Sequence, residues 1–251
     1  MEQQPEIGIL TFGGPAEQSR RRKFVELLRK CPIPDDELLL NLGLFLTPQT
    51  LSRVLFMDFL YRQILPVQGV IIEFGCRWGQ NLSLFSSLRG IYEPYNRLRK
   101  IVGLDTFAGL SGVSPKDGDR MKAGAYAVSP QYEDFLQRVL DMQEQESPLP
   151  HLKKYEVIKG DAAVGIREYL SRHPETVVAM AYFDMDIYEP TVQCLRAIKD
   201  RLTLGSVVGF DEANDPACPG ETLALSEVFG LGNIALSRFP YNSRASYLTI
   251  K

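Results

Sequence analysis

The chain has 251 residues, which is enough for one α/β domain with a small appendage. Hydrophobic residues make up 45% of it, and the formal net charge of −3 argues against general nucleic-acid binding, because such binding needs a basic surface. We expect no membrane span and no signal peptide, since no apolar run is long enough and the N-terminus is polar. Four scattered cysteines without a C-x-x-C pair predict reduced thiols in a cytoplasmic protein.

Residues 1–65 form a predicted N-terminal helical segment. A helix over residues 19–30 carries a basic cluster at 20–23, which either binds a phosphate or forms a solvated face. A second helix begins at T-P-Q-T, where Thr47 can cap the first turn and Pro48 can occupy the first helical position. We expect this segment to pack against the main domain or against a second subunit.

The main domain, residues 66–251, is predicted to begin with a strand and a glycine loop. The strand V-I-I-E-F contains Glu73, and the loop G-C-R-W-G-Q-N contains Gly75 and Gly79. A glycine turn between a strand and a helix brings backbone N–H groups close to a ligand. The G-x-x-x-G spacing differs from the G-x-G-x-x-G of dinucleotide enzymes, so a dehydrogenase is a distant alternative.

The next two predicted strands also end in acidic residues. K-I-V-G-L-D-T-F contains Asp105 and Thr106, and an acid at the end of the second strand can accept hydrogen bonds from both ribose hydroxyls of a cofactor. Y-E-V-I-K-G-D ends in Asp161, which Ala162 follows. The position of Asp161 can meet the adenine edge of a cofactor, or Asp161 can simply cap the following helix.

A long insertion, residues 111–150, lies between these two strands. It opens with glycine, proline and charged residues and continues with a helical run over residues 131–145. Loops of this length are often lids, and Lys116, Arg120 and Lys122 can receive a phosphate-bearing substrate. A mobile surface loop is an equally good interpretation.

Residues 177–214 contain two apolar strands separated by a helix, which predicts parallel strands. Asp184 and Asp186 follow the first strand, and Asp211 and Glu212 follow the second, at the edge where open α/β sheets bind ligands. Four carboxylates there repel one another, and hard oxygen ligands suit Mg²⁺ or Ca²⁺. If the first strand continues, Asp184 and Asp186 share one face. The alternative is that these acids merely start helices.

The last two strands, I-A-L-S-R-F-P and A-S-Y-L-T-I, are predicted to form a hairpin. The hairpin adds an antiparallel strand to a parallel sheet. The predicted fold class is therefore α/β, with a Rossmann-like, mostly parallel sheet, a C-terminal antiparallel hairpin strand and N-terminal helices.

These features together resemble the class I S-adenosylmethionine-dependent methyltransferases, and more narrowly the macrocin-type sugar O-methyltransferases. The motifs that carry the resemblance are E-F-G-C-R-W-G-Q, G-L-D-T-F-A-G-L and D-x-D-x-Y-x-x-T, the last with Tyr188 and Thr191. The resemblance extends from about residue 44 to the C-terminus. The chain departs from the family at Glu212, where an aspartate is usual, and in the order of Arg77 and Trp78.

The resemblance implies a binding site for S-adenosylmethionine made of Glu73, Gly75, Gly79, Asp105, Thr106, Asp161, Ala162 and Asp184. It implies Mg²⁺ bound by Asp184, Asp211 and Glu212, with Asp186 as the general base. It also implies a homo-oligomer, at least a dimer, that methylates a sugar hydroxyl in antibiotic biosynthesis. The basic insertion favours a nucleotide-deoxysugar, such as a TDP-rhamnose-like donor for an enediyne antibiotic, over a glycosylated natural product.

Two other functions remain open at this point. A catechol-type O-methyltransferase uses the same metal chemistry on adjacent phenolic hydroxyls. A non-catalytic cofactor-binding protein binds S-adenosylmethionine but transfers nothing to a hydroxyl.

Overall fold

The computed structural model describes residues 13–251, so the first twelve residues of the predicted N-terminal segment lie outside the described residues. The core of the fold is a seven-stranded sheet in the order β3-β2-β1-β4-β5-β7-β6. The strands are β1 (Val70–Phe74), β2 (Ile101–Asp105), β3 (Tyr155–Lys159), β4 (Val178–Phe183), β5 (Leu202–Phe210), β6 (Ser237–Arg238) and β7 (Ser246–Thr249). The predicted α/β class with a mostly parallel sheet is confirmed.

The five strands β1 to β5 run parallel, and their carboxyl ends lie level with one another. Phe74 pairs with Phe183, which in turn pairs with Phe210, so β1, β4 and β5 end side by side. The three rings stack, with centroid distances of 4.7 Å and 5.4 Å. This buried aromatic row fixes the level at which the polar loops leave the sheet.

The predicted C-terminal hairpin is also confirmed. Strand β7 pairs antiparallel with β5 on one side and with the short β6 on the other. The loop between β6 and β7 carries Arg244 to the carboxyl end of β5, since Ser246 pairs with Phe210.

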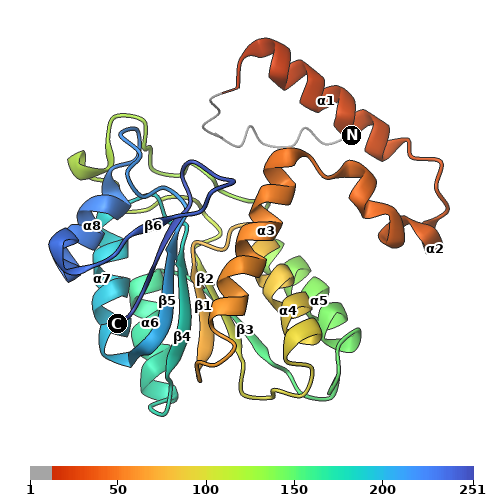
Figure 1. Ribbon diagram of the computed structural model, residues 1–251. Helices are drawn as coiled ribbons and strands as arrows, with labels where there is room; N and C mark the ends of the chain where they lie inside the picture. Colours follow the sequence, from red (N-terminus) through yellow and green to blue (C-terminus); the bar gives the residue numbers. More distant parts are fainter. Residues whose placement is uncertain (1–12) are drawn as a thin grey trace.

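Helices cover both faces of the sheet (Figure 1). One face carries α3 (Pro48–Gln63), α4 (Gln80–Tyr92) and α5 (Tyr132–Gln145), and the other carries α6 (Ala162–Arg172), α7 (Tyr188–Ile198) and α8 (Gly220–Phe229). Each face has its own apolar cluster, because a sheet covered on both sides buries side chains in both directions. Three short 3-10 turns complete this domain: Pro115–Asp117, Lys199–Arg201 and Leu231–Asn233.

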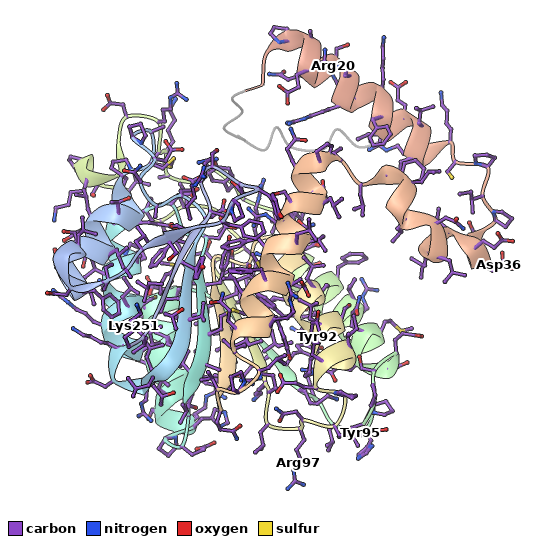
Figure 2. All side chains as sticks on the ribbon, viewed as in Figure 1. Arg20, Asp36, Tyr92, Tyr95, Arg97 and Lys251 are labelled. Carbon is purple, nitrogen blue, oxygen red and sulfur yellow. The ribbon has the colours of Figure 1, made fainter. Side chains whose placement is uncertain are left out.

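The part of the N-terminal segment that precedes α3 forms an arm that stands away from the sheet (Figures 1 and 2). It consists of α1 (Pro15–Arg29), α2 (Asp35–Leu38) and the 3-10 helix η1 (Leu39–Phe45), none of which contains a buried residue. The predicted basic cluster at residues 20–23 is exposed on α1. Thr47 caps α3 by accepting a hydrogen bond from the backbone of Thr50, as predicted.

Membrane spans and disulfides can be examined in residues 13–251. None of the helices there is by itself long and apolar enough to cross a membrane. One pair, Asp35–Phe45 with Pro48–Gln63, meets the length and composition test together but is bent by 94°. The four cysteines form no disulfide.

The second half of the insertion is part of the folded core. Leu136 and Leu140 of α5 are buried in the cluster beneath α4. Gly79, at the start of α4, adopts a φ of +73°, and a Cβ atom there would lie 2.2 Å from Leu136 Cδ1. A glycine at this position therefore satisfies both the left-handed backbone and the close approach of α5.

Gly79→Ala is expected to lower the free energy of unfolding by about 2–4 kcal/mol, because it combines a strained φ with overpacking. Gly112→Ala is the matched control, since Gly112 has a similar φ of +79° but no atom within 4 Å of its added Cβ. The control is expected to cost only about 1 kcal/mol. Urea denaturation measures both, and equal losses would show that contact with Leu136 is unimportant.

Candidate functional site

A cavity of about 450 Å³ opens at the carboxyl ends of the parallel strands. Its lining contains all but one of the residues predicted for the site: Glu73, Gly75, Asp105, Thr106, Asp161, Ala162, Asp184, Asp186, Asp211 and Glu212. Gly79 is the exception, and its role in the structure is the packing against α5. Acidic side chains in the lining outnumber basic ones, so the cavity favours a positively charged ligand.

The loops after β1 and β2 build one end of the cavity. Asp105 accepts hydrogen bonds from the backbone N–H groups of Arg77 at 2.7 Å and Phe107 at 2.6 Å. Glu73 is buried and accepts a 2.7 Å hydrogen bond from Asn81, while its Oε2 makes no hydrogen bond to a described residue. Burial raises the pKa of Glu73 to about 8. Gly75 has a φ of +85°, and a Cβ there would lie 2.0 Å from the Asp184 carbonyl oxygen.

The loop after β3 shows that the two interpretations of Asp161 are compatible. Its side chain caps α6 by accepting a 2.9 Å hydrogen bond from the backbone of Val164. Asp161 and Ala162 nevertheless line the cavity. The helix cap therefore does not remove Asp161 from the wall of the cavity.

The loops after β4 and β5 bring the four predicted acids to the other end of the cavity. Strand β4 ends at Phe183, and Asp186 has a φ of +62°. The expectation that Asp184 and Asp186 share one face of an extended strand is therefore wrong, because the chain turns between them. Burial, then the charge of Asp211, raises the pKa of Asp184, and burial with the charge of Glu212 raises the pKa of Asp186.

Two arginines that the sequence did not suggest pair with these acids. Arg53 of α3 lies 3.1 Å from Asp184 and 2.6 Å from Asp211. Arg244, from the loop of the C-terminal hairpin, pairs with Glu212 and also lies 2.9 Å from Asp215. Both guanidinium groups line the cavity beside the acids.

Comparison with solved structures identifies the family. The calicheamicin methyltransferase CalS11 matches with 42% identity and a TM-score of 0.91, over 95% of this chain and 94% of that chain. The chain belongs to the macrocin-type family of S-adenosylmethionine-dependent sugar O-methyltransferases. The apo structure of CalS11, described as a TDP-rhamnose 3'-O-methyltransferase of calicheamicin biosynthesis, matches with 40% identity over 96% of each chain and a TM-score of 0.85.

More distant matches support the fold of this methyltransferase alone. The O-methyltransferase NovP is 17% identical over 80% of each chain, with a TM-score of 0.59. No protein-family model matches the chain, and no curated protein matches it by sequence. The family assignment therefore depends on the CalS11 structures.

Two buried carboxylates of the methyltransferase hold the acidic loops in place. Glu221, at the start of α8, accepts hydrogen bonds from the backbone of Met185 at 3.1 Å and of Glu212 at 3.4 Å. Asp117, in the insertion, accepts a 2.5 Å hydrogen bond from the backbone of Tyr188. Neither residue was predicted, because neither belongs to a motif.

The three basic residues proposed for the insertion do not reach the cavity. Lys116 lies over the ring of Tyr188, 3.7 Å from its centroid. Lys116, Arg120 and Lys122 are all missing from the cavity lining, whereas Ser111 and Tyr126 contribute to it. The prediction that these three basic side chains receive the substrate's phosphates has no support from this arrangement.

The predicted metal ligands fit a divalent cation in chemistry but are not assembled as a metal site. Within residues 13–251, no three His, Cys, Asp or Glu side chains are grouped closely enough to hold a metal ion. Their oxygens are hard donors, and Glu212 Oε2 is buried without a hydrogen bond to a described residue. The guanidinium of Arg53 occupies the position of a cation between Asp184 and Asp211.

Proposed function

We propose that this enzyme transfers a methyl group from S-adenosylmethionine to a hydroxyl of a nucleotide-activated deoxysugar, TDP-rhamnose in the first instance, for antibiotic biosynthesis of the enediyne type. The observation that carries the proposal is 40% identity, over 96% of both chains, to a TDP-rhamnose 3'-O-methyltransferase of calicheamicin biosynthesis. The acidic cavity supports it, because the sulfonium of the methyl donor is positively charged.

In this proposal the loops after β1, β2 and β3 bind the methyl donor. Asp105 would accept hydrogen bonds from the ribose hydroxyls, and Asp161 with Ala162 would contact the adenine edge. Gly75 lets the loop after β1 pass close to the Asp184 carbonyl, which a side chain at this position would meet. Glu73 and Thr106 complete this end of the cavity, and we propose that Asp184, on the loop after β4, also contacts the methyl donor.

We propose that Asp184, Asp211 and Glu212 hold Mg²⁺. A bound Mg²⁺ would supply charge stabilisation for the acceptor oxygen as its proton leaves. The chain's own residues supply the oxygen donors, and Glu221 fixes the backbone of the two loops that carry them.

We propose Asp186 as the general base. It lines the cavity from the loop after β4 and is nine-tenths buried, so water does not compete freely for its carboxylate. A carboxylate that accepts the hydroxyl proton makes the sugar oxygen a better nucleophile for the methyl group.

We propose that a helical N-terminal segment, residues 1–65, precedes the methyltransferase domain, residues 66–251. Within the predicted lid, 111–150, α5 is packed against α4 and contributes Leu136 and Leu140 to the core. We therefore propose that residues 111–131 close over the cavity, where Ser111 and Tyr126 already line it.

A paired acceptor assay separates this function from its main alternative. Purified enzyme is incubated with S-adenosylmethionine and Mg²⁺, and with either TDP-rhamnose or a catechol. Mass spectrometry is expected to show methylation of TDP-rhamnose alone. Methylation of the catechol alone would replace the proposal with a catechol-type O-methyltransferase, and tight S-adenosylhomocysteine binding without any transfer would favour a non-catalytic protein.

We propose that the enzyme is cytoplasmic. We also propose that it is a homo-oligomer in which the N-terminal arm contacts a second copy. Leu39 and Leu40 of η1 are among the most exposed leucines described, at 76% and 86%. Apolar side chains in an arm without buried residues are typical of a surface that a partner covers.

Leu40→Asp is expected to shift the enzyme to a smaller assembly in size-exclusion chromatography with light scattering. A buried charge in an apolar interface is costly, and here it would stand between two copies. Leu204→Asp is the control, because Leu204 on β5 is 76% exposed but lies outside the arm. A wild-type monomer, or an unchanged mass for Leu40→Asp, would contradict this proposal.

A further inference from the structure

Arg53 differs from the structural arginines of the fold. Arg99 is 1% exposed and donates to the carbonyls of Gly69, Ile64 and Val67 as well as to Glu93. Arg53 is 26% exposed, and its hydrogen bonds go to two carboxylates that line the cavity. The polar partners of Arg53 are therefore two carboxylates, which are also the groups that a metal cation binds.

The two carboxylates that Arg53 joins come from the loops that follow two different strands, β4 and β5. Its Nη1 lies 3.1 Å from Asp184 Oδ2 and its Nη2 lies 2.6 Å from Asp211 Oδ1. The Tyr182 hydroxyl also donates to Asp211 Oδ1, at 2.9 Å. Two hydrogen-bond donors thus already occupy Oδ1, one of the two carboxylate oxygens of Asp211.

We infer that Arg53 is a built-in counter-cation, which holds Asp184 and Asp211 together before a divalent cation is present and must withdraw when the cation binds. A guanidinium and a divalent ion repel each other, so both cannot lie between the same two carboxylates. Arg53 therefore lowers the cation affinity of the resting enzyme while it keeps the acids in place. This inference rests on the proposed Mg²⁺ site.

Withdrawal of the Arg53 guanidinium does not require α3 to leave the sheet. Helix α3 packs on β4 through Phe56, whose ring meets that of Tyr182 edge-on with a centroid distance of 6.2 Å. This apolar contact does not depend on the ion pair. Arg53 can therefore move as a side chain while α3 stays in position.

The test is a Mn²⁺ titration of the full-length enzyme, without methyl donor or acceptor, in which electron paramagnetic resonance reports free Mn²⁺. Arg53→Gln is expected to bind Mn²⁺ at least about tenfold more tightly than wild type, a difference of about 1.4 kcal/mol. Arg62→Gln is the control, because Arg62 lies on the same helix and pairs with Asp58 at the surface. Its affinity is expected to equal that of wild type.

Equal or weaker Mn²⁺ binding by Arg53→Gln, with clear binding by wild type, would overturn the inference and leave the metal proposal intact. No binding by any variant would overturn both. A second measurement uses wild-type enzyme labelled with ¹⁵N-arginine and needs no variant to fold. Mg²⁺ is expected to shift the Arg53 side-chain resonance and not that of Arg62, and an unshifted Arg53 resonance at saturating Mg²⁺ would contradict the inference.

Discussion

Asp186→Asn is expected to lower kcat for methyl transfer by about 10²–10⁴-fold, the usual contribution of a general base. Asparagine keeps the size of the side chain but cannot accept the hydroxyl proton. The left-handed backbone of Asp186 also tolerates asparagine better than most residues. The fold and the affinity for S-adenosylhomocysteine are therefore expected to remain. Steady-state kinetics measures kcat, and calorimetry measures the affinity for S-adenosylhomocysteine.

Asp200→Asn is the control for this variant, because Asp200 is exposed in the turn between α7 and β5. It removes one carboxylate without touching the cavity, so kcat should stay at the wild-type value. Near-normal turnover by Asp186→Asn would remove Asp186 from the role of base.

Chelation of divalent cations is expected to abolish methyl transfer, and added Mg²⁺ is expected to restore it. Asp184, Asp186, Asp211 and Glu212 share one cavity, and the guanidiniums of Arg53 and Arg244 balance only part of their charge. Without a further cation, some of these carboxylates are expected to take up protons, which fits the raised pKa of Asp184 and Asp186. The assay compares initial rates with EDTA, with EDTA followed by excess Mg²⁺, and with no addition.

Asp211→Asn separates a bound metal from a general effect of chelation. This variant is expected to lose activity at low Mg²⁺ and to regain part of it at high Mg²⁺, because one donor of the proposed set becomes neutral. Full activity of the wild-type enzyme in excess EDTA would remove Mg²⁺ from the account while leaving the methyltransferase assignment in place.

The positions of the strands and of the acidic loops were predictable from sequence because the determinants are local. Short apolar runs such as V-I-I-E-F gave β1, and the parallel crossover then required that Asp184 and Asp211 meet at one edge. The cap at Thr47 and the terminal hairpin likewise depend on a few adjacent residues.

The partners of those acids were not predictable in the same way. Arg53 stands 131 positions before Asp184, in a helix whose pattern gives no reason to single it out. The role of Glu221 was not predictable for a different reason. Its carboxylate accepts hydrogen bonds from backbone N–H groups of loops that only the folded chain brings together. The turn at Asp186 was missed because alternating acids also suit a strand.

The most direct test of the central claim is transfer of a trideuterated methyl group from labelled S-adenosylmethionine to TDP-rhamnose, by wild type and Asp186→Asn in the presence of Mg²⁺. The account predicts that wild type gives a nucleotide sugar heavier by one labelled methyl group, with the label on a sugar oxygen in the fragment spectrum, and that the variant gives almost none. An unlabelled nucleotide sugar with wild type, under conditions where the enzyme binds S-adenosylhomocysteine, would contradict it.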